Sequence, residues 1–310
     1  MTVVEEKTPP IKKNVVGKPG GTSRRTALII GVVLVVLVIA YVFSLIGFES
    51  ELNNRKTTNG SDKSAIANRV DVLATVLTVD PIKSMLTVRL DFKPNGAFLA
   101  ANGRDINKDM VLRVNSTTGA QERPFAKGKQ MLGTEVSLDL NEGDVANYPF
   151  EAYQSGLVIE LVEKVDAAAT TQEPPVPFSI QFLGSVHGYK FESSVAPQTE
   201  EGYNELAITT ARSAATVTFA IVVMTIMVLL TLAVVIVIGW VVFRGRKIEF
   251  AMFGWIGTLL FAFPAIRNAM PGAPPIGALP DFLVFFWVEG IVVLTMVALV
   301  ISWLLRPAAK

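Results

Sequence analysis

The sequence has 310 residues, of which 51% are apolar and 18% charged, with a net charge of +1, one histidine and no cysteine. The balanced charge gives no electrostatic footprint for nucleic-acid binding. The lack of cysteine excludes disulfides and thiolate metal sites. The apolar residues are gathered in long runs, and this clustering indicates a membrane protein.

The N-terminal part of the chain combines a basic tail with the first apolar run. Residues 1–26 are rich in Lys and Arg, and residues 27–48 form a run long enough to cross a ~30 Å hydrocarbon core as a helix. A cleaved signal peptide is the alternative. Its apolar stretch would be about 7–15 residues long and followed by a small-residue cleavage site, which this run does not offer. We expect a retained transmembrane helix over residues 27–48.

Residues 49–213 lie between the first and second apolar runs. The polar stretch 49–68 predicts a loose linker. Apolar and polar residues then alternate with the period of two that is typical of half-buried strands, most clearly over Met85–Phe92. About seven such stretches are separated by breaks rich in Asp, Pro, Gly and Asn. They favour an antiparallel sandwich or barrel, and of the two we expect the β-sandwich.

This segment carries no motif that indicates an enzyme. The only histidine is His187, whereas a hydrolytic triad needs a base beside a nucleophile. Metal ligands are few, although a calcium site built from carboxylates stays open. Neither a P-loop nor a GxGxxG motif follows a strand. We expect a non-enzymatic protein with no cofactor and no bound nucleotide.

The motif NYPFEAYQS, residues 147–155, stands out because three aromatic residues fall within six positions. One interpretation is a corner at which aromatic side chains fill one end of the sandwich. The other is an exposed aromatic patch that docks a partner close to the membrane. The residues involved are Tyr148, Pro149, Phe150, Glu151 and Tyr153.

Three further apolar runs follow, and we expect transmembrane helices over residues 214–243, 250–266 and 282–305. The third of the four runs is short and contains Pro264, so a buried or re-entrant segment is the alternative. Gly254 and Gly257 in this run allow close approach of a neighbouring helix. Lys and Arg gather in the tail 1–26, the loop 244–249 and the tail 306–310, which predicts that both termini are cytoplasmic and the sandwich is extracytoplasmic.

Residues 267–281 form a stiff loop between the last two runs. Its prolines restrict the backbone and its glycines permit tight turns, so it is easily ordered against another surface. We expect it to dock on the sandwich of its own chain. The residues are Arg267, Pro271, Gly272, Pro274, Pro275, Gly277 and Asp281.

Glu289 lies within the last apolar run, where an acid needs a partner. An ion pair with Arg267 across the two helices is one expectation. The alternative is that Glu289 reaches towards the headgroups while Arg267 binds a lipid phosphate.

The NYPFEAYQS motif and the stretch RNAMPGAPPIGALPDFLVFFWVEG, residues 267–290, resemble the actinobacterial membrane proteins of the DUF4436 family over about residues 25 to 305. The family's usual Tyr-Pro-Phe-Asp is present here with Glu151 in the last position. This resemblance implies an N-terminal anchor, an exported β-domain and a three-helix membrane region.

Within that family the chain is similar to an accessory subunit of a mycobacterial Mce-type fatty-acid importer. The resemblance implies a non-catalytic role in assembly, stability or regulation. Its partners would be membrane lipids and the permease and exported subunits of a lipid-transport complex in the inner membrane. A membrane-anchored ligand sensor or a stand-alone envelope protein is the main alternative. A small transporter is less favoured because no polar pathway crosses the middle of the four spans.

Overall fold

The computed structural model describes residues 45–49, 58–61, 66–165, 173–195, 201–272 and 274–306, and a few further positions between residues 28 and 42. The chain divides into two compact units, Met1–Val42 and Phe43–Lys310. The described positions between residues 28 and 49 are helical. Much of the expected first transmembrane helix, residues 27–48, lies outside the described residues, as does the tail 1–26.

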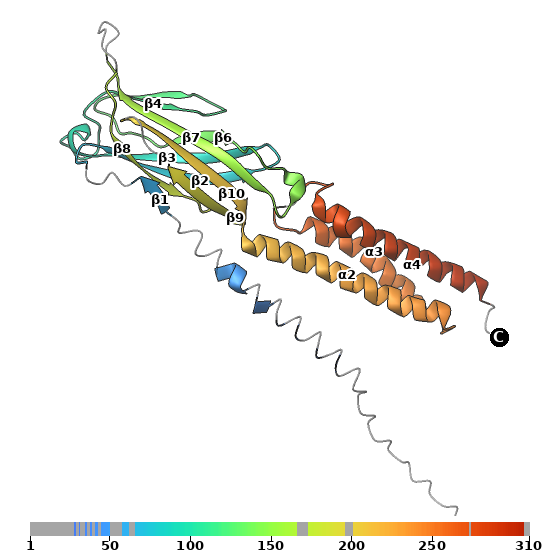
Figure 1. Ribbon diagram of the computed structural model, residues 1–310. Coiled ribbons are helices and arrows are strands. Elements are labelled where there is room, and N and C mark those ends of the chain that lie inside the picture. The colour runs from blue at the N-terminus through green and yellow to red at the C-terminus, as the bar shows by residue number, and fades with distance from the viewer. Residues whose placement is uncertain are drawn as a thin grey trace, which may run out of the picture. The chain divides into compact units, whose positions relative to one another are not determined.

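The second unit is an α+β structure with strands first and helices last (Figure 1). The strands are β1 (Thr58–Ser61), β2 (Val70–Asp80), β3 (Met85–Pro94), β4 (Met110–Val114), β5 (Glu122–Phe125), β6 (Thr134–Asp139), β7 (Ala152–Glu163), β8 (Phe178–Leu183), β9 (Tyr189–Val195) and β10 (Tyr203–Arg212). The long helices are α2 (Ala214–Phe243), α3 (Phe250–Asn268) and α4 (Phe286–Leu305), with short helical turns η1 (Gly96–Phe98), η2 (Val145–Asn147) and η3 (Asp281–Phe285).

The strands form two five-stranded sheets, in the orders β1-β8-β2-β3-β6 and β5-β4-β7-β10-β9. Every described pairing is antiparallel except that of β2 with β8, in which Val70 lies opposite Phe178. The expectation of a wholly antiparallel arrangement was therefore wrong at this position. A parallel pair needs a long connection, and here about 100 residues of chain, including most of the second sheet, lie between the two strands.

Both sheets contribute to one hydrophobic core, because alternate residues of the strands point inwards. In β2, for example, Val70, Val72, Ala74 and Val76 are all buried. The seven expected alternating stretches correspond to β2, β3, β4, β6, β7, β8 and β9. The alternation missed β1, which lies in the expected linker, and β5 and β10.

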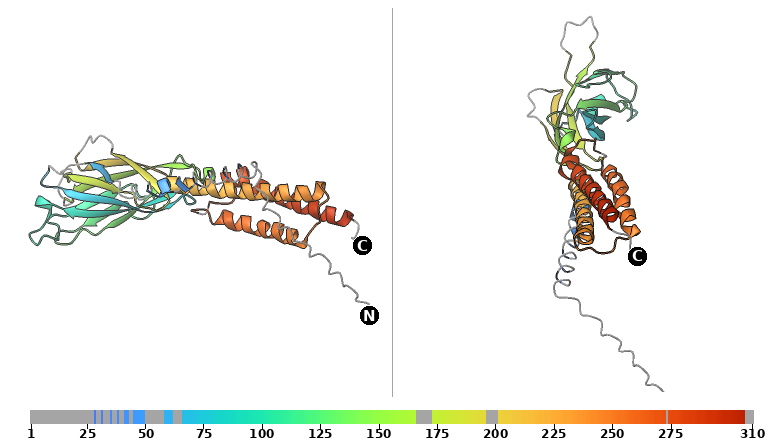
Figure 2. Two further views of the ribbon diagram at one scale, coloured as in Figure 1. Left: turned by 90° about the horizontal axis from the view of Figure 1, so that it is seen from below. Right: turned by 90° about the vertical axis from the view of Figure 1, so that its right-hand side faces the viewer.

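The three long helices lie side by side (Figure 2) and are long and apolar enough to cross a membrane. In α2 the buried residues recur at steps of three or four, which places them on one stripe of the helix. They are Thr216, Ala220, Val223, Met227, Thr231, Val234, Ile238 and Val241. Most of the other side chains of α2 are apolar and many of them are exposed, as expected for a helix in contact with lipid.

Helices α3 and α4 differ from expectation at their facing ends. The helix α3 continues through Pro264 and ends at Asn268, two residues later than predicted. Before α4, residues Asp281–Phe285 form one π-helical turn. The loop between the two helices is therefore anchored at both ends in helical backbone.

Candidate functional site

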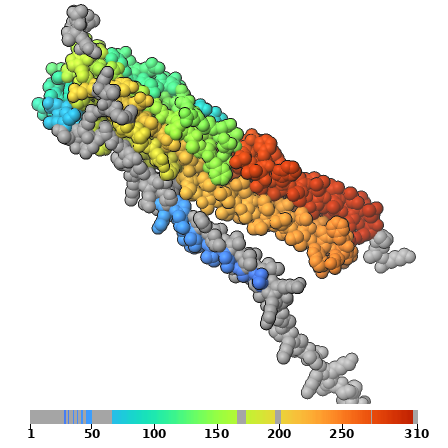
Figure 3. All heavy atoms as spheres, viewed as in Figure 1, coloured from blue at the N-terminus to red at the C-terminus, as the bar shows by residue number. Residues whose placement is uncertain are grey.

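The strands meet the helices at a junction, which we define as the turn Tyr148–Glu151, Tyr189, the link Arg212–Ser213 and the loop 267–281. In the space-filling view the green part of the strand region touches the red end of the helical region here (Figure 3). The junction contains most of the residues singled out in the sequence. It brings together segments that lie more than 100 residues apart.

Strand β10 runs into α2 with a single residue between them. Arg212 ends the strand, Ser213 is the N-cap, and α2 begins at Ala214. The Ser213 hydroxyl accepts a hydrogen bond from the Thr216 amide at 3.3 Å, which satisfies one of the free donors of the first turn. The Ser213 amide and the Thr216 hydroxyl both donate to the Gly188 carbonyl, at 3.0 and 3.2 Å. The start of α2 is thus fixed to the turn before β9.

Arg212 makes a buried ion pair with Glu151. The Nε atom donates to Glu151 Oε1 at 2.6 Å, and the two side chains are only 4% and 0% exposed. The guanidinium also lies between two aromatic rings, 5.1 Å from the centroid of Tyr148 and 4.4 Å from that of Tyr189. A buried charge without a partner is costly, so Glu151 and Arg212 require each other.

Tyr148 links the two parts of the unit directly. Its side chain is fully buried, and it packs in the hydrophobic cluster of the helices rather than in that of the strands. Its hydroxyl donates to the Pro271 carbonyl at 2.9 Å. Burial raises the pKa of Tyr148 to about 12, against the opposing effect of Arg212, so the hydroxyl keeps its proton at neutral pH.

Gly272 allows the loop to approach Arg212. Its φ of +74° lies in the left-handed region that favours glycine. A Cβ atom at this position would overlap the guanidinium of Arg212. The loop was expected to dock on the β-domain of its own chain, and the contacts of Pro271 and Gly272 place it there.

Arg267 holds the loop closed from within. Its Nε and Nη2 atoms donate to the two carboxylate oxygens of Asp281 at 2.7 and 2.6 Å, and it also donates to the carbonyls of Pro274 and Pro275 at 2.8 and 2.7 Å. Asp281 accepts a further bond from the Gly277 amide at 2.7 Å. Both charged side chains are buried. Such a bidentate pair fixes the geometry as well as the charge.

The expected pair between Arg267 and Glu289 was therefore wrong. Asp281 lies at the N-terminal end of the next helical segment, where the helix dipole favours an acid, and the guanidinium of Arg267 is satisfied by Asp281 together with the carbonyls of Pro274 and Pro275. Oε1 of Glu289 is buried and has no hydrogen-bond partner in the described part of the chain.

The NYPFEAYQS motif is divided between three environments, so neither interpretation describes all of it. Tyr148 and Pro149 are buried, and the bond between them is cis. Tyr153 packs in the core of the strands. Phe150 points outwards and is 59% exposed. The motif is a structural corner with one exposed aromatic side chain.

The close helix contact expected at Gly254 and Gly257 is absent from the described structure. A Cβ atom added to either glycine would meet nothing within 4 Å. Helix α3 instead buries Ile256, Leu259 and Phe263, which lie on a different face.

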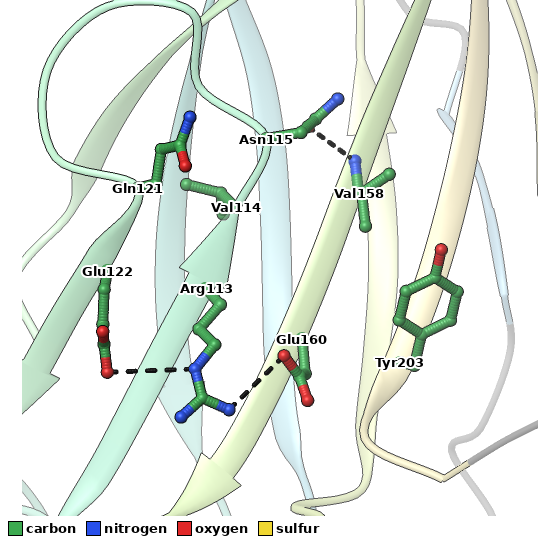
Figure 4. A pocket seen from close by; sticks show the side chains of 8 residues that line it. All are labelled: Arg113, Val114, Asn115, Gln121, Glu122, Val158, Glu160 and Tyr203. Carbon is green, nitrogen blue, oxygen red and sulfur yellow. Dashed lines mark hydrogen bonds and ion pairs between the residues drawn. The ribbon is translucent and has the colours of Figure 1, made fainter.

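A second polar site lies on the β-domain, around Arg113 (Figure 4). This groove of about 350 Å³ includes Glu122 and Glu160, and Arg113 bonds to Glu173 at 2.6 Å. The hydrogen bond that Arg113 donates to Glu173 outweighs the cost of burial and raises the pKa of Arg113. Because Arg113 of β4 is paired with Glu122 of β5 and Glu160 of β7, these charges stabilise the pairing of the three strands. Among the described residues, no group of three His, Cys, Asp or Glu side chains could hold a metal ion.

Sequence reasoning missed Arg212, Ser213 and Tyr189. Two signals were present in the sequence. Ser213 directly precedes an apolar run, as an N-cap does, and Arg212 is an isolated charge at the end of an alternating stretch. Nothing in the sequence indicated that Arg212 pairs with Glu151, because the two residues lie 61 positions apart.

The fold and the junction define an α+β protein in which two sheets are fastened to three helices that are long and apolar enough to cross a membrane. Residues 60–211 match the family model of DUF4436, a domain of unknown function, as the resemblance in the sequence led us to expect. This match ends before the helices. Residues 212–306 match a second domain of unknown function, DUF8686, so the resemblance to DUF4436 is shorter than expected. No curated protein matches the chain.

Proposed function

We propose that this protein is a non-catalytic accessory subunit of a Mce-type lipid import complex in the bacterial inner membrane. In this proposal four helices cross the membrane, both termini are cytoplasmic, and the two sheets form a sandwich in the periplasm. The permease would contact the helices, and an exported subunit would contact the sandwich. The role is to assist assembly, stability or regulation of the complex.

The observation that supports the proposal is that the junction is held rigidly and presents exposed apolar side chains on its surface. The bonds of Tyr148, Arg212 and Arg267 hold the strands and the loop as one body. On this body Phe150 is 59% exposed and Ile276 is 87% exposed. A large apolar side chain on a rigid support loses little entropy on binding, so such residues suit a docking surface.

A sensor that signals through the membrane is the second candidate. It is favoured by the direct link between β10 and α2, which would carry a movement of the sheet into a helix. It requires a ligand site in the strands. The groove at Arg113 fits this requirement poorly, because its arginine is already paired with carboxylates.

The test is affinity purification of the tagged protein from its own bacterium in mild detergent, followed by mass spectrometry. The proposal predicts stoichiometric recovery of a permease, its ATPase and exported Mce subunits. Recovery of the protein alone, from a preparation in which another membrane complex stays intact, would refute it and favour the sensor.

A matched pair of substitutions tests the docking surface. Phe150→Ser removes an exposed apolar side chain at the junction. Leu132→Ser removes one of similar exposure, 61%, between β5 and β6. Recovery of the partners should fall for the first variant and stay unchanged for the second. An equal effect of both would show that the junction is not the docking surface.

A further inference from the structure

A groove lies between the C-terminal end of α2 and the N-terminal end of α3, on the side away from the junction. It combines basic side chains with an apolar floor. Its volume is about 630 Å³, which falls within the size range of small-molecule sites. The polar end carries Arg246 and Lys247. Trp240, Glu249 and the apolar side chains of Ile236, Val237 and Met252 also line the groove.

Two arginines share one aromatic ring at this groove. The guanidinium of Arg244 lies 4.7 Å from the centroid of Trp240, and that of Arg246 lies 5.7 Å away. Both stack on the indole through cation–π contacts. Two positive charges on one ring repel each other, and neither is ion-paired with Glu249 or any other described carboxylate. An anion bound beside Arg246 would reduce this repulsion.

Arg306 binds the backbone carbonyls at the C-terminal end of α2, so Arg246 and Lys247 are not needed there. It donates to the carbonyls of Val241, at 2.6 Å, and of Arg246. The Val241 carbonyl is one of the last four of α2, which a helix C-terminus otherwise leaves free, and the Arg246 carbonyl lies in the link that follows the helix. The negative end of the α2 dipole is thus already neutralised, and the remaining cations are available to an external ligand.

The groove changes from polar to apolar along the helix axis. Ile236 lies one turn, ~6 Å, deeper along α2 than Trp240. In a helix of membrane-spanning length, a tryptophan beside cations at one end lies at the level of the lipid headgroups. The floor of Ile236, Val237 and Met252 then lies at the level of the first acyl carbons.

We propose that this groove binds the headgroup of an anionic phospholipid. Arg246 and Lys247 contact the phosphate, Trp240 lies at the level of the glycerol, and the apolar floor receives an acyl chain. The site lies at the end of α2 away from the junction, and it does not depend on the partners proposed above.

The experiment is native mass spectrometry of the full-length protein, purified in detergent and incubated with phosphatidylglycerol or with phosphatidylcholine. Arg246→Gln with Lys247→Gln removes the phosphate contacts and leaves Arg306 intact. Lys127→Gln with Lys129→Gln is the control, because it makes the same change in net charge at exposed residues of the β-domain. Inorganic phosphate at millimolar concentration tests competition by a free anion.

Retention of phosphatidylglycerol should fall about 25-fold in the Arg246/Lys247 variant, because each basic residue near a lipid surface contributes a factor of ~5. The control variant should retain it, and phosphatidylcholine should not be retained by either. Equal retention by the two variants would overturn the proposal. Displacement of the lipid by inorganic phosphate would also overturn it, in favour of a soluble phosphate-bearing ligand.

Discussion

The hydrogen bond from Tyr148 to Pro271 gives the sharpest test of how the strands are fastened to the loop. The substitution Tyr148→Phe keeps the buried ring and removes only the hydroxyl. One hydrogen bond contributes ~0.5–1.5 kcal/mol net, and the Pro271 carbonyl, left without its donor, adds to the cost. We expect the free energy of unfolding to fall by about 1–2 kcal/mol, or ~2–4 °C in melting temperature for a chain of this size.

The matched control is Tyr153→Phe, in the same motif. The Tyr153 hydroxyl is buried but has no hydrogen-bond partner among the described residues. Removing it relieves an unsatisfied polar group, so the melting temperature should stay unchanged or rise. Burial, and secondarily the negative charge of Glu151, raises the pKa of Tyr153, which agrees with an unfavourable site for an ionised hydroxyl.

The assay is thermal unfolding of the full chain in one detergent, combined with amide hydrogen exchange of the loop 267–281. Tyr148→Phe should increase exchange in this loop, whereas Tyr153→Phe should not. The reasoning is refuted if the two variants lose equal stability, or if the loop exchanges at the same rate in both.

Three further predictions concern the same junction. Gly272→Ala should cost more stability than Gly277→Ala, because both glycines have positive φ but only the first would overlap a neighbouring side chain; melting temperatures compare them. Arg267→Met should cost about 3–5 kcal/mol, since it leaves Asp281 buried without its partner, and restoration of stability by the added change Asp281→Leu would show that the unpaired charge is the cause. Burial raises the pKa of Tyr189 from 10.0 to about 12, so its contribution to stability is complete below pH 10 and is lost as the pH rises towards 12. Between pH 9 and 12 the melting temperature of the Tyr189→Phe variant should fall less than that of the unaltered protein. An equal fall of melting temperature with pH in both proteins would contradict this.

The sequence was most informative where a local pattern determines the structure. The alternation in β2 and the apolar lengths of α2 and α4 predicted these elements to within a few residues. Strand β5 was missed because its four residues, ERPF, contain two charges and a proline. Strand β1 was missed because a short polar edge strand resembles a linker.

The candidate site was predicted only in part, because its contacts are long-range. The proline and glycine content of the loop indicated that it is rigid. The partner of Arg267 was assigned to Glu289, on the assumption that an acid among apolar residues needs a cation most. The structure shows that Asp281 is closer along the chain and lies in better geometry for a bidentate pair. The partner of Arg267 was thus determined by the position of the acid at the end of the loop and not by the apolar surroundings of the acid.

Because only Ser213 separates β10 from α2, a tilt of one element is transmitted to the other. Helix α2 has 30 residues and is ~45 Å long, while the ten residues of β10 extend ~33 Å on the other side of Ser213. With Ser213 and Thr216 clamped to Gly188, a tilt of α2 by about 10° would carry the far end of β10 through ~6 Å. Because β10 lies between β7 and β9 in its sheet, these strands would move with it. A change in the packing of one helix thus becomes a displacement at the outer edge of the sheet.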